Sequence, residues 1–338
     1  MQQSVQTDSP ISVTPGAVGH YCPHCHRAPL AARHAAYHCG SCGRSYPVVN
    51  GVPILINDEN SVFAVADYLD TCPVASNNKR AKATGLRAVY LRVAHAISEK
   101  KVMPTRFNME TALADAASSD RARVLVIGAG GARYSYPADI VYTDVAFSPG
   151  LKAIADGHDL PFGDAEFDLV ISIALLEHVA DPQRVVDEIW RVLKPSGRVF
   201  ASTPFLQPVH MGAYDFTRFT YLGHRRLFRK FADLDSGMDL GPGAVMAWSM
   251  QSLLINLSAR RTYRLMARFA GLLIAFPVKY LDYIVRKNPA SIDGAGSVFF
   301  FGRKQENAIS DRELIGLYRG GFNHRTASLY WVGQIGTE

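Results

Sequence analysis

The sequence predicts an α/β protein with a doubly wound sheet, a small cysteine-rich module at its N-terminus and a helical insertion near its C-terminus. An apolar strand at 123–127 runs directly into the glycine loop 128–131, which is the order of elements in doubly wound nucleotide-binding folds. Four cysteines form two close pairs between residues 22 and 42. A basic amphipathic stretch at 241–290 precedes the last apolar strand.

The composition limits the function only loosely. The 338 residues are 48% hydrophobic and 20% charged, which allows a full core and two or three domains. A formal net charge of +6 leaves anionic partners open, including nucleic acid and membrane surfaces, without requiring one. The longest apolar run of the C-terminal part, residues 269–278, is far shorter than the roughly 20 residues of a membrane-spanning helix.

Three segments are expected to lie outside the main domains. Residues 1–20 are polar and lack the basic start and apolar stretch of a secretory signal, so we expect a disordered tail and a cytoplasmic protein. Residues 58–120 are expected to form a linker and a helical cap, with apolar residues at helical spacing within 86–97. The C-terminal tail, 304–338, is expected to contain one short helix at 310–318.

The two cysteine pairs predict a zinc ribbon over residues 21–57. Each Cys-x2-Cys motif can present two thiolates on one face of a tight turn, and two motifs complete a tetrahedral site for a structural Zn²⁺. The predicted ligands are Cys22, Cys25, Cys39 and Cys42. In a chain without a secretory signal, such pairs favour a metal over disulfides. Nearby histidines are alternative ligands: His24, His26 and His38.

A hairpin is expected directly after the second cysteine pair, because Asn50-Gly51 is typical of a two-residue turn between strands. With both cysteine pairs, the segment Tyr46-Pro-x-x-Asn-Gly-x-Pro53 resembles small zinc-ribbon proteins that are partners of nucleic-acid and protein methyltransferases, and ribbons fused to bacterial methyltransferases. The resemblance implies a docking surface for a catalytic domain or a substrate. The alternative is a metal staple on a domain too small to fold alone.

The glycine loop predicts a nucleotide site at the carboxyl end of the first strand. Its glycines let backbone amides approach a ligand closely: Gly128, Gly130 and Gly131. A second strand at 140–144 ends in Asp144, at the place where a carboxylate accepts hydrogen bonds from both ribose hydroxyls. These features alone fit NAD as well.

The next segment, Asp156-Gly-His-Asp-Leu-Pro-Phe162, followed by an apolar strand at 167–173, resembles the class I S-adenosylmethionine-dependent methyltransferases of type 11 and not NAD enzymes. The resemblance continues through a helix at 182–194 and strands at 198–203 and 297–302. It implies a Rossmann-like methyltransferase sheet within 121–303. It also implies that Asp156 meets the adenine amino group, that the Gly157 backbone meets the ring, and that residues 160–162 wall the purine pocket.

The chain departs from this family at two points of the cofactor site. Val126 stands where the family usually has an acid two positions before the first glycine, and Ala132 replaces the last glycine of the loop. Eleven residues separate Asp144 from Asp156, so the crossover helix is expected to be abbreviated or absent.

Helix 182–194 is expected to be capped by Asp181, with Pro182 at its first position. Its buried face is expected to contain Val186, Trp190 and Leu193. The segment 195–197, Pro-Ser-Gly, is expected to end it.

Candidate catalytic bases lie after the fourth and fifth strands. His178 follows the fourth strand, and His210, Tyr214 and Asp215 follow the fifth. His178 and His210 are the candidates to remove a proton from the acceptor or to bind it; the alternative is that each is a structural histidine. No Asn/Asp-Pro-Pro-aromatic motif follows the fourth strand, which favours an oxygen acceptor over an amide or exocyclic amine, with carbon still open.

Residues 241–290 carry seven cations and the single acid Asp282 among apolar residues. One interpretation is contact with an anionic membrane or a lipid-linked acceptor, which would place the protein peripherally at the inner membrane face. The other is a set of helices packed on the core with solvated arginines. Weak similarity of 210–218 and 241–243 to methyltransferases of envelope-polysaccharide clusters favours a glycan or lipid-linked acceptor.

Three functions follow as hypotheses. The leading one is O-methylation of a small-molecule, glycan or lipid-linked acceptor with S-adenosylmethionine as cofactor. The second is an RNA methyltransferase that holds phosphates with the ribbon and the basic surface, although the ribbon lacks the interleaved aromatic and basic residues of nucleic-acid readers. The third is a non-catalytic scaffold with a degenerate cofactor loop.

Overall fold

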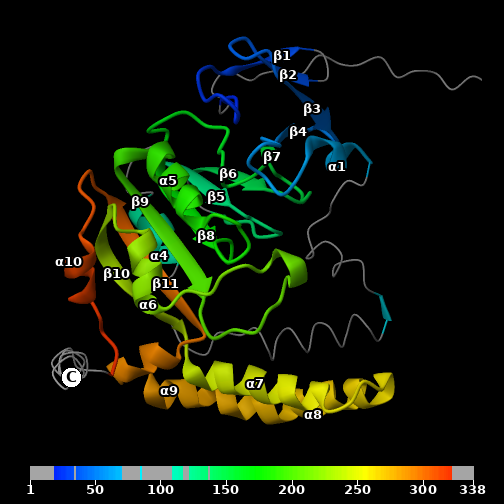
Figure 1. Cartoon of the computed structure of the whole chain (residues 1–338), viewed down its shortest axis with the longest axis vertical. Coiled ribbons are helices and arrows are strands. Elements are labelled where there is room, and N and C mark those ends of the chain that lie inside the picture. The colour runs from blue at the N-terminus through cyan, green and yellow to red at the C-terminus, as the bar shows by residue number, and fades with distance from the viewer. Residues whose placement is uncertain are drawn as a thin grey trace, which may run out of the picture. The chain divides into compact units, whose positions relative to one another are not determined.

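The computed structural model describes residues 19–33, 36–70, 84–85, 109–116, 122–135 and 138–321 (Figure 1). The chain forms two compact units, the first made of residues 1–82 and 113–199 and the second of residues 83–112 and 200–338. The expectations for residues 1–18, for the helix within 86–97 and for the tail beyond residue 321 lie outside the described residues.

One sheet runs through the first unit. Its strand order is β1-β2-β3-β4-β7-β6-β5-β8, followed by β9, which begins in this unit and continues into the second. The strands are β1 (Leu30–Arg33), β2 (Ala36–Cys39), β3 (Ser45–Val49), β4 (Val52–Leu55), β5 (Arg123–Ile127), β6 (Asp139–Asp144), β7 (Ala153–Ala155), β8 (Phe167–Ile173) and β9 (Leu193–Pro204).

The N-terminal strands form the predicted ribbon. Strands β1 to β4 pair in sequence, each antiparallel to the next. The turn between β3 and β4 is Asn50-Gly51, with φ of 52° and 76°, and such a two-residue turn requires positive φ at both positions. The hairpin expected at this turn is confirmed.

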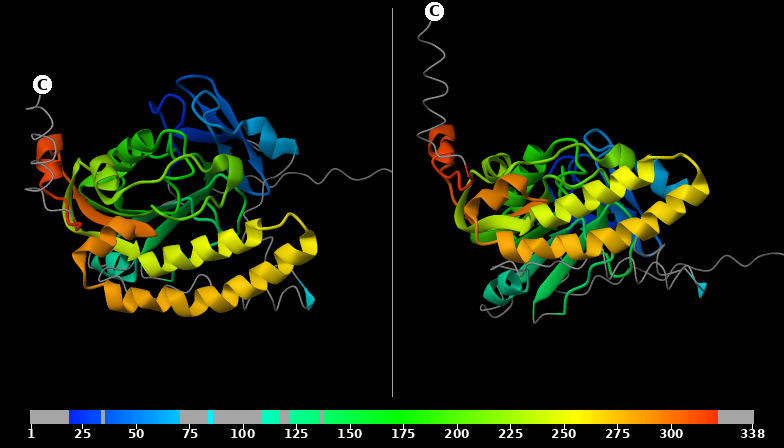
Figure 2. Two further views of the ribbon diagram at one scale, coloured as in Figure 1. Left: turned by 60° about the horizontal axis from the view of Figure 1, so that its bottom comes forward. Right: turned by 90° about the horizontal axis from the view of Figure 1, so that it is seen from below.

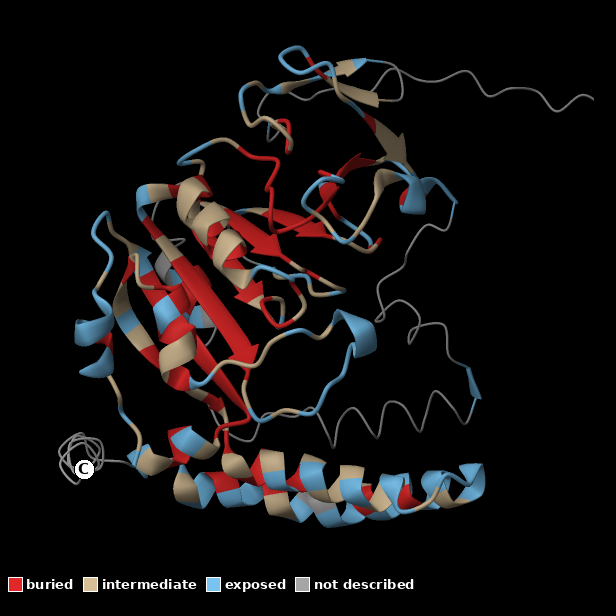
Figure 3. Ribbon diagram, viewed as in Figure 1, coloured by how far each residue is buried: buried red, intermediate tan, exposed pale blue. Residues whose placement is uncertain are grey.

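The other strands of the first unit form the predicted parallel sheet. Strand β5 is parallel to β6 and to β8, and β6 is parallel to β7. These strands are almost entirely buried (Figure 3), which explains why they are continuous apolar runs in the sequence. The chain order reverses at β5, with β6 and β7 on one side and β8 on the other. In such sheets the ligand crevice lies outside the carboxyl ends of the strands at this reversal.

The connections differ in length from those of a full doubly wound sheet. Residues 145–152, which join β6 to β7, contain no helix, as expected from their number. Between β8 and β9 the chain forms helix α5 (Pro182–Val192), whose first turn is capped by the Asp181 side chain, which accepts a hydrogen bond from the Arg184 N–H.

Two details of helix α5 were predicted wrongly. The helix ends at Val192 and β9 begins at Leu193, so the segment Pro195-Ser-Gly197 lies inside a strand. Lys194 precedes a proline, where the helical conformation is disfavoured, and the helix ends before that position. Trp190 is only half-buried, and the buried face consists of Val185, Val186, Ile189 and Val192.

The second unit contains strands in the order β9-β11-β10 and a helical hairpin. Its elements are η1 (Gly212–Tyr214), α6 (Tyr221–Leu227), β10 (Phe231–Leu240), α7 (Pro242–Asn256), α8 (Arg261–Val278), η2 (Lys279–Leu281), α9 (Asp282–Val285), η3 (Pro289–Gly294), β11 (Ser297–Lys304) and α10 (Asp311–Ile315). Helix α1 (Val65–Asp70) belongs to the first unit, and α4 (Met109–Ala116) crosses from the second unit into the first. Strands β10 and β11 are antiparallel. Helix α10 ends at Ile315, before Gly316, and is shorter than expected.

Helices α7 and α8 lie side by side (Figure 2). The buried carboxylate of Asp282 holds the two ends of this hairpin together, because it accepts hydrogen bonds from the backbone N–H groups of Gly243 (2.7 Å) and Ala244 (3.2 Å) at the start of α7. A side chain at Gly241 or Gly243 would collide with Asp282, which accounts for the two glycines. Among the described residues, no helix has both the length and the apolar character to cross a membrane.

Candidate functional site

The four predicted cysteine ligands converge in the ribbon. Their sulfur atoms all lie within 4.8 Å of one another, and two of the separations are 3.6 Å, between Cys22 and Cys42 and between Cys25 and Cys39. Tetrahedral zinc with Zn–S bonds of about 2.3 Å requires sulfur–sulfur separations of roughly 3.8 Å. The cluster therefore fits a tetrahedral zinc ion.

The three alternative histidine ligands have other partners. The Nδ1 of His38 lies 2.7 Å from the Ser45 hydroxyl, His24 Nδ1 lies 3.6 Å from a Glu59 carboxylate oxygen, and His26 pairs with Asp159. The four-cysteine set is thus the one that the fold brings together.

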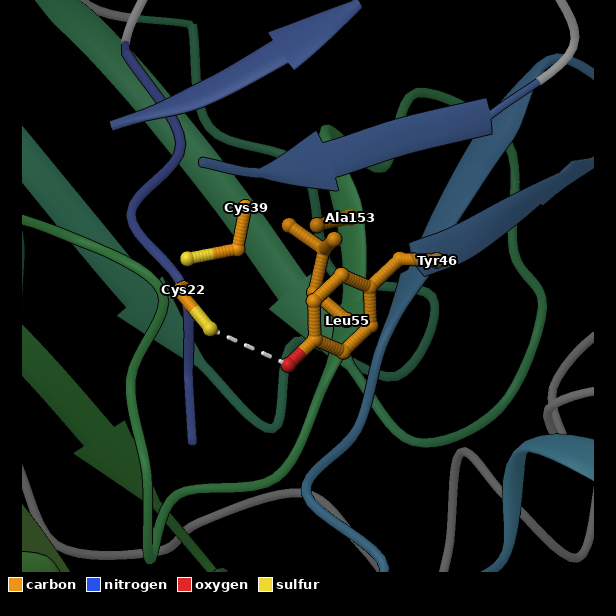
Figure 4. Close-up of a cluster of buried hydrophobic side chains, with 5 residues drawn as sticks. All are labelled: Cys22, Cys39, Tyr46, Leu55 and Ala153. Carbon is orange, nitrogen blue, oxygen red and sulfur yellow. Dashed lines mark hydrogen bonds between the residues drawn. The ribbon is translucent and has the colours of Figure 1, made fainter. Parts of the chain in front are cut away.

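The ribbon and the parallel sheet share one hydrophobic cluster. Strand β4 pairs in parallel with β7, with Ile54 opposite Ile154 and Leu55 opposite Ala155. Around this junction Cys22, Cys39, Tyr46, Leu55 and Ala153 pack together, and the Tyr46 hydroxyl lies 3.3 Å from the Cys22 sulfur (Figure 4). Two of the predicted cysteine ligands are therefore part of the core that supports the sheet edge.

Asp159 joins the ribbon to the segment that follows β7. This carboxylate is 5% exposed. One oxygen accepts hydrogen bonds from the side-chain amides of Asn57 and Asn60, both at 2.9 Å. The other accepts from Arg184 of α5 at 2.6 Å and lies 3.5 Å from His26. Burial alone would raise the pKa of Asp159, but these partners outweigh burial and lower it.

Helix α5 holds the 156–162 loop through its backbone. Arg191 donates to the carbonyl oxygens of Leu160 (3.0 Å) and Phe162 (2.8 Å), and Glu188 accepts from the Leu160 N–H (2.8 Å). From the ribbon side, the Tyr21 N–H donates to the carbonyl of Pro161 (2.9 Å). The loop is therefore fixed between α5 and the ribbon.

Asp156, the predicted adenine contact, is also tied to the segment after the ribbon. Its Oδ1 accepts from the His158 backbone (3.0 Å) and lies 2.6 Å from His158 Nδ1, and its Oδ2 accepts from the Ser61 hydroxyl. The Asp181 N–H lies against His158 Nε2 at 3.1 Å, and although burial lowers the pKa of His158, the Asp156 carboxylate outweighs burial and raises it. Burial alone would raise the pKa of Asp156, but its hydrogen bonds outweigh burial and lower it. One acceptor position of Oδ2 is left for a ligand.

The glycine loop meets Asp144 at the reversal of the sheet. The Gly130 N–H donates to Asp144 Oδ2 (2.6 Å) and the Ala146 N–H to Oδ1 (2.8 Å). Gly128 and Gly130 have positive φ, 63° and 55°, which favours glycine, and Gly131 lies exposed in the same turn. Burial raises the pKa of Asp144 despite these N–H groups.

A leucine that the sequence reasoning did not single out lies over this loop. A β-carbon at Gly128 would come within 2.9 Å of Leu175 Cδ1, and one at Gly157 within 3.1 Å of Val185 Cγ1. Gly157 is therefore needed for the approach of α5, and Leu175 limits the space above the glycine loop. Leu175 follows Ala174, whose φ of 51° turns the chain sharply after β8.

The segment 160–162 supports the loop from inside. Leu160 and Phe162 are fully buried, and the Phe162 ring packs edge-on against Phe167 with 5.1 Å between centroids. At the carboxyl end of β8, the buried hydroxyl of Ser172 has no hydrogen-bond partner among the described residues. Positive-φ glycines, a carboxylate at the end of β6 and this hydroxyl fit a nucleoside-type cofactor.

The two candidate bases belong to different units. His178 lies in the first unit, one turn after β8, where its N–H donates to the Leu175 carbonyl (2.8 Å) and its Nε2 lies 3.6 Å from Glu177. His210 lies in the second unit, where its Nδ1 is 3.5 Å from Asp215. Asp215 in turn accepts two hydrogen bonds from Arg218, which hold the pKa of this carboxyl well below its usual range.

A hollow of about 340 Å³ opens beside His210 within the second unit. Its lining combines an aromatic ring, side-chain amides, a hydroxyl and a cation: Gln207, Pro208, Val209, His210, Trp248, Gln251, Ser252, Ile255, Asn256 and Arg264. Its volume is in the range of small-ligand sites.

Comparison with known proteins agrees with this geometry. Residues 127–201 match a family model described as a methyltransferase domain. This segment is similar to methyltransferase domains. It contains the glycine loop, Asp144, the 156–162 loop and His178, and its fold is the Rossmann-like methyltransferase sheet that the sequence predicts.

Related proteins match over short stretches. An uncharacterized protein of Methanocaldococcus jannaschii is 35% identical over 88 residues, which are 23% of this chain and 43% of that protein. A ubiquinone biosynthesis O-methyltransferase of Xylella fastidiosa is 35% identical over 104 residues, 24% of this chain and 42% of that protein. A demethylmenaquinone methyltransferase of Clavibacter sepedonicus is 45% identical over 64 residues, 18% and 26% of the two chains. The chain thus spans less than half the length of these relatives.

Solved structures are similar at a lower level. A complex of the Haloferax volcanii Trm112 methyltransferase activator with a methyltransferase aligns with a TM-score of 0.39 at 17% identity and covers 67% of this chain and 97% of that one. A Galdieria sulphuraria protein described as a sarcosine dimethylglycine methyltransferase has the same TM-score at 16% identity and covers 65% and 88% of the two chains.

We predict that Asp159→Asn lowers the free energy of unfolding by about 1–3 kcal/mol. The substitution removes the charge and replaces one carboxylate oxygen with an NH₂ donor, so either the Asn57 and Asn60 amides or the Arg184 guanidinium loses its acceptor. Urea unfolding followed by circular dichroism measures the change. Asp164→Asn is the matched control, because this aspartate also pairs with an α5 arginine but its side chain is 80% exposed, and a change within about 0.5 kcal/mol is expected.

The same pair of variants gives a pH test. The pKa of Asp159 is lower in the folded protein than in the unfolded chain, so its stabilising effect is complete above the unfolded pKa of about 3.9 and is lost as the pH falls below it. The difference between wild type and Asp159→Asn should therefore shrink in acid. A difference that is constant down to the acid transition would contradict an ionised role for this carboxylate.

Proposed function

We propose that the protein is an S-adenosylmethionine-dependent methyltransferase that methylates an oxygen of a small-molecule, glycan or lipid-linked acceptor. The observation that carries the proposal is the contact of Asp144 with the Gly130 N–H at the reversal of the sheet, 2.6 Å long, inside the segment that matches a methyltransferase domain. Bound there, S-adenosylmethionine would supply an electrophilic methyl group, so alignment of the acceptor accounts for much of the rate.

The residues of this chain would hold the cofactor at two ends. Asp144 would accept hydrogen bonds from the ribose, Gly128, Gly130 and Gly131 would give the backbone close access, and the 156–162 loop with Asp156 and Gly157 would receive the adenine. The space over Gly128 is limited by Leu175, which would lie against the bound cofactor. Val126 is a buried strand residue and offers no acceptor to the methionine end.

Replacing Asp144 with alanine should weaken S-adenosylmethionine binding at least tenfold, because one or two hydrogen bonds to a charged acceptor are lost. Isothermal titration calorimetry measures the dissociation constant. Asp139→Ala is the matched control: it lies at the opposite end of the same strand, is 52% exposed and pairs with Arg123. Unchanged affinity in Asp144→Ala, or no binding by the wild type in the millimolar range, would contradict the cofactor site; the latter would favour a non-catalytic scaffold.

The acceptor part of the proposal is supported by the His210 pair and the hollow beside it. The buried Asp215 carboxylate, kept ionised by Arg218, lies next to His210 Nδ1 and would stabilise the imidazolium formed when His210 takes a proton from a hydroxyl. Trp248 and the amides of Gln207, Gln251 and Asn256 suit a sugar-like acceptor. The exposed positive charge of residues 241–290 supports a lipid-linked acceptor at the inner face of a membrane.

His210→Asn should lower the rate of methyl transfer by about 10²-fold or more while leaving S-adenosylmethionine affinity unchanged. The measurement follows tritiated methyl from S-adenosylmethionine into the lipid and polysaccharide fractions of a bacterial extract, with transfer to RNA as a separate fraction. His38→Asn, a ribbon histidine bonded to Ser45, serves as control. Full transfer by His210→Asn would remove it as the base and leave His178, whereas label in RNA alone would overturn the acceptor proposal.

We also propose that the four-cysteine site holds structural zinc. Purified protein should contain one zinc per chain, and Cys39→Ser should lose it, while Cys72→Ser, outside both motifs, should keep it. Because Cys39 packs with Leu55 and Ala153, zinc removal by a chelator should lower both the melting temperature and S-adenosylmethionine affinity. Mass spectrometry measures the metal content. Absence of zinc, together with a melting temperature that a chelator leaves unchanged, would argue against this role.

A further inference from the structure

The outward face of helix α8 carries large apolar side chains in the open. Leu265, Phe269 and Leu273 are 59%, 57% and 71% exposed, and their spacing of four residues places them in one row along the helix. Met266, 72% exposed, adjoins this row. We call these four residues the α8 stripe. A contiguous exposed apolar surface of this kind marks an interaction site.

The stripe lies opposite the side of α8 that packs on α7. That inner side is formed by the small residues Ala267 and Gly271, both buried. The helices approach so closely that a β-carbon at Gly271 would lie 2.8 Å from Gln251 of α7. Packing within the hairpin is therefore made by the small residues, and the stripe residues stay more than half exposed.

The charges around the stripe are all positive. Between Pro242 and Pro289 the chain has a single acid, Asp282, which is 2% exposed and bonded to the start of α7. Lys279 is buried as well. The exposed charged residues of this stretch are Arg260, Arg261, Arg264, Arg268, Arg286 and Lys287. Arg261, Arg264 and Arg268 follow one another at helical spacing along one flank of the stripe.

The exposed apolar row and the positive charges beside it together indicate which kind of surface would bind the stripe. A second copy of the same hairpin would bring the same positive charges face to face, which is unfavourable. A nucleic acid would satisfy the arginines but would leave four large apolar side chains against phosphates. An anionic lipid surface satisfies both, since apolar side chains enter the acyl boundary while arginines remain at the headgroups.

We propose that the α7–α8 hairpin lies flat on an anionic membrane surface, with the α8 stripe in the interface and Arg261, Arg264 and Arg268 on the lipid headgroups. This inference is independent of methyl transfer. It bears on the proposed function at one point: Arg264 also lines the hollow beside His210, so a lipid-linked acceptor held in the same membrane would present its headgroup at the edge of that hollow.

The test is co-sedimentation of the full chain with vesicles of phosphatidylcholine, alone or mixed with phosphatidylglycerol. We expect binding to the mixed vesicles at low salt, weaker binding as salt rises, and little binding to phosphatidylcholine alone. The triple variant Leu265→Ser, Met266→Ser, Leu273→Ser should bind at least tenfold more weakly. The control is Ile315→Ser on α10, which removes a 58% exposed apolar residue elsewhere and should bind as the wild type does.

A second variant reports the depth of insertion and guards against a folding defect. Leu273→Trp should show a blue-shifted emission and quenching by brominated lipid chains when mixed vesicles are added, and Ile315→Trp should show neither. Absence of binding to mixed vesicles at low salt would overturn the proposal. So would binding that the triple variant leaves unchanged, or a concentration-dependent dimer in analytical ultracentrifugation that the triple variant abolishes.

S-adenosylmethionine titration keeps this proposal separate from the proposed function. The triple variant should bind the cofactor with unchanged affinity, because none of its residues belongs to the first unit. Loss of vesicle binding with intact cofactor binding would support the membrane contact. Intact vesicle binding in Asp144→Ala, with cofactor binding lost, would confirm that the two sites are independent.

Discussion

The parallel pairing of β4 with β7 is the constraint on which the rest of the first unit depends. Only two residue pairs form it, Ile54 with Ile154 and Leu55 with Ala155, and a junction so short gains little from backbone hydrogen bonds alone. Its strength comes from what surrounds it. Cys22 and Cys39 pack into the shared cluster on one side, and Asp159 accepts hydrogen bonds from Asn57 and Asn60 just after β4.

This junction also explains how the sheet manages with an abbreviated crossover. Strand β7 consists of three buried residues, Ala153, Ile154 and Ala155, and the connection that leads to it contains no helix. Without β4, β7 would be an apolar edge strand with unpaired backbone groups. The ribbon covers that edge, so it is a structural part of the first unit. The 156–162 loop follows β7 directly, so the pairing of β7 with β4 of the ribbon also positions this loop.

The second unit is organised around a different buried carboxylate. Asp282 closes the α7–α8 hairpin by capping α7, and this removes the one negative charge of the insertion from its surface. The consequence is a hairpin whose exposed charges are uniformly positive and whose outer helix presents apolar residues. Arg264 lines the polar hollow beside His210 and also flanks the apolar α8 stripe, so the two features adjoin each other on the hairpin.

The sequence by itself determined the elements whose signals are local. The Cys-x2-Cys motifs, the Asn50-Gly51 turn, the strand at 123–127 and the Asp181 cap each depend on neighbours within a few residues, and the structure contains all of them. Only the tertiary structure decided that Asp156 accepts a hydrogen bond from Ser61, that Asp159 accepts from both Asn57 and Arg184 of α5, and that Leu175 lies over Gly128. These partners lie 25 or more positions apart in the sequence, beyond the reach of any local motif. A buried carboxylate must find hydrogen-bond donors wherever the fold brings them, and this determines the partners of Asp156 and Asp159.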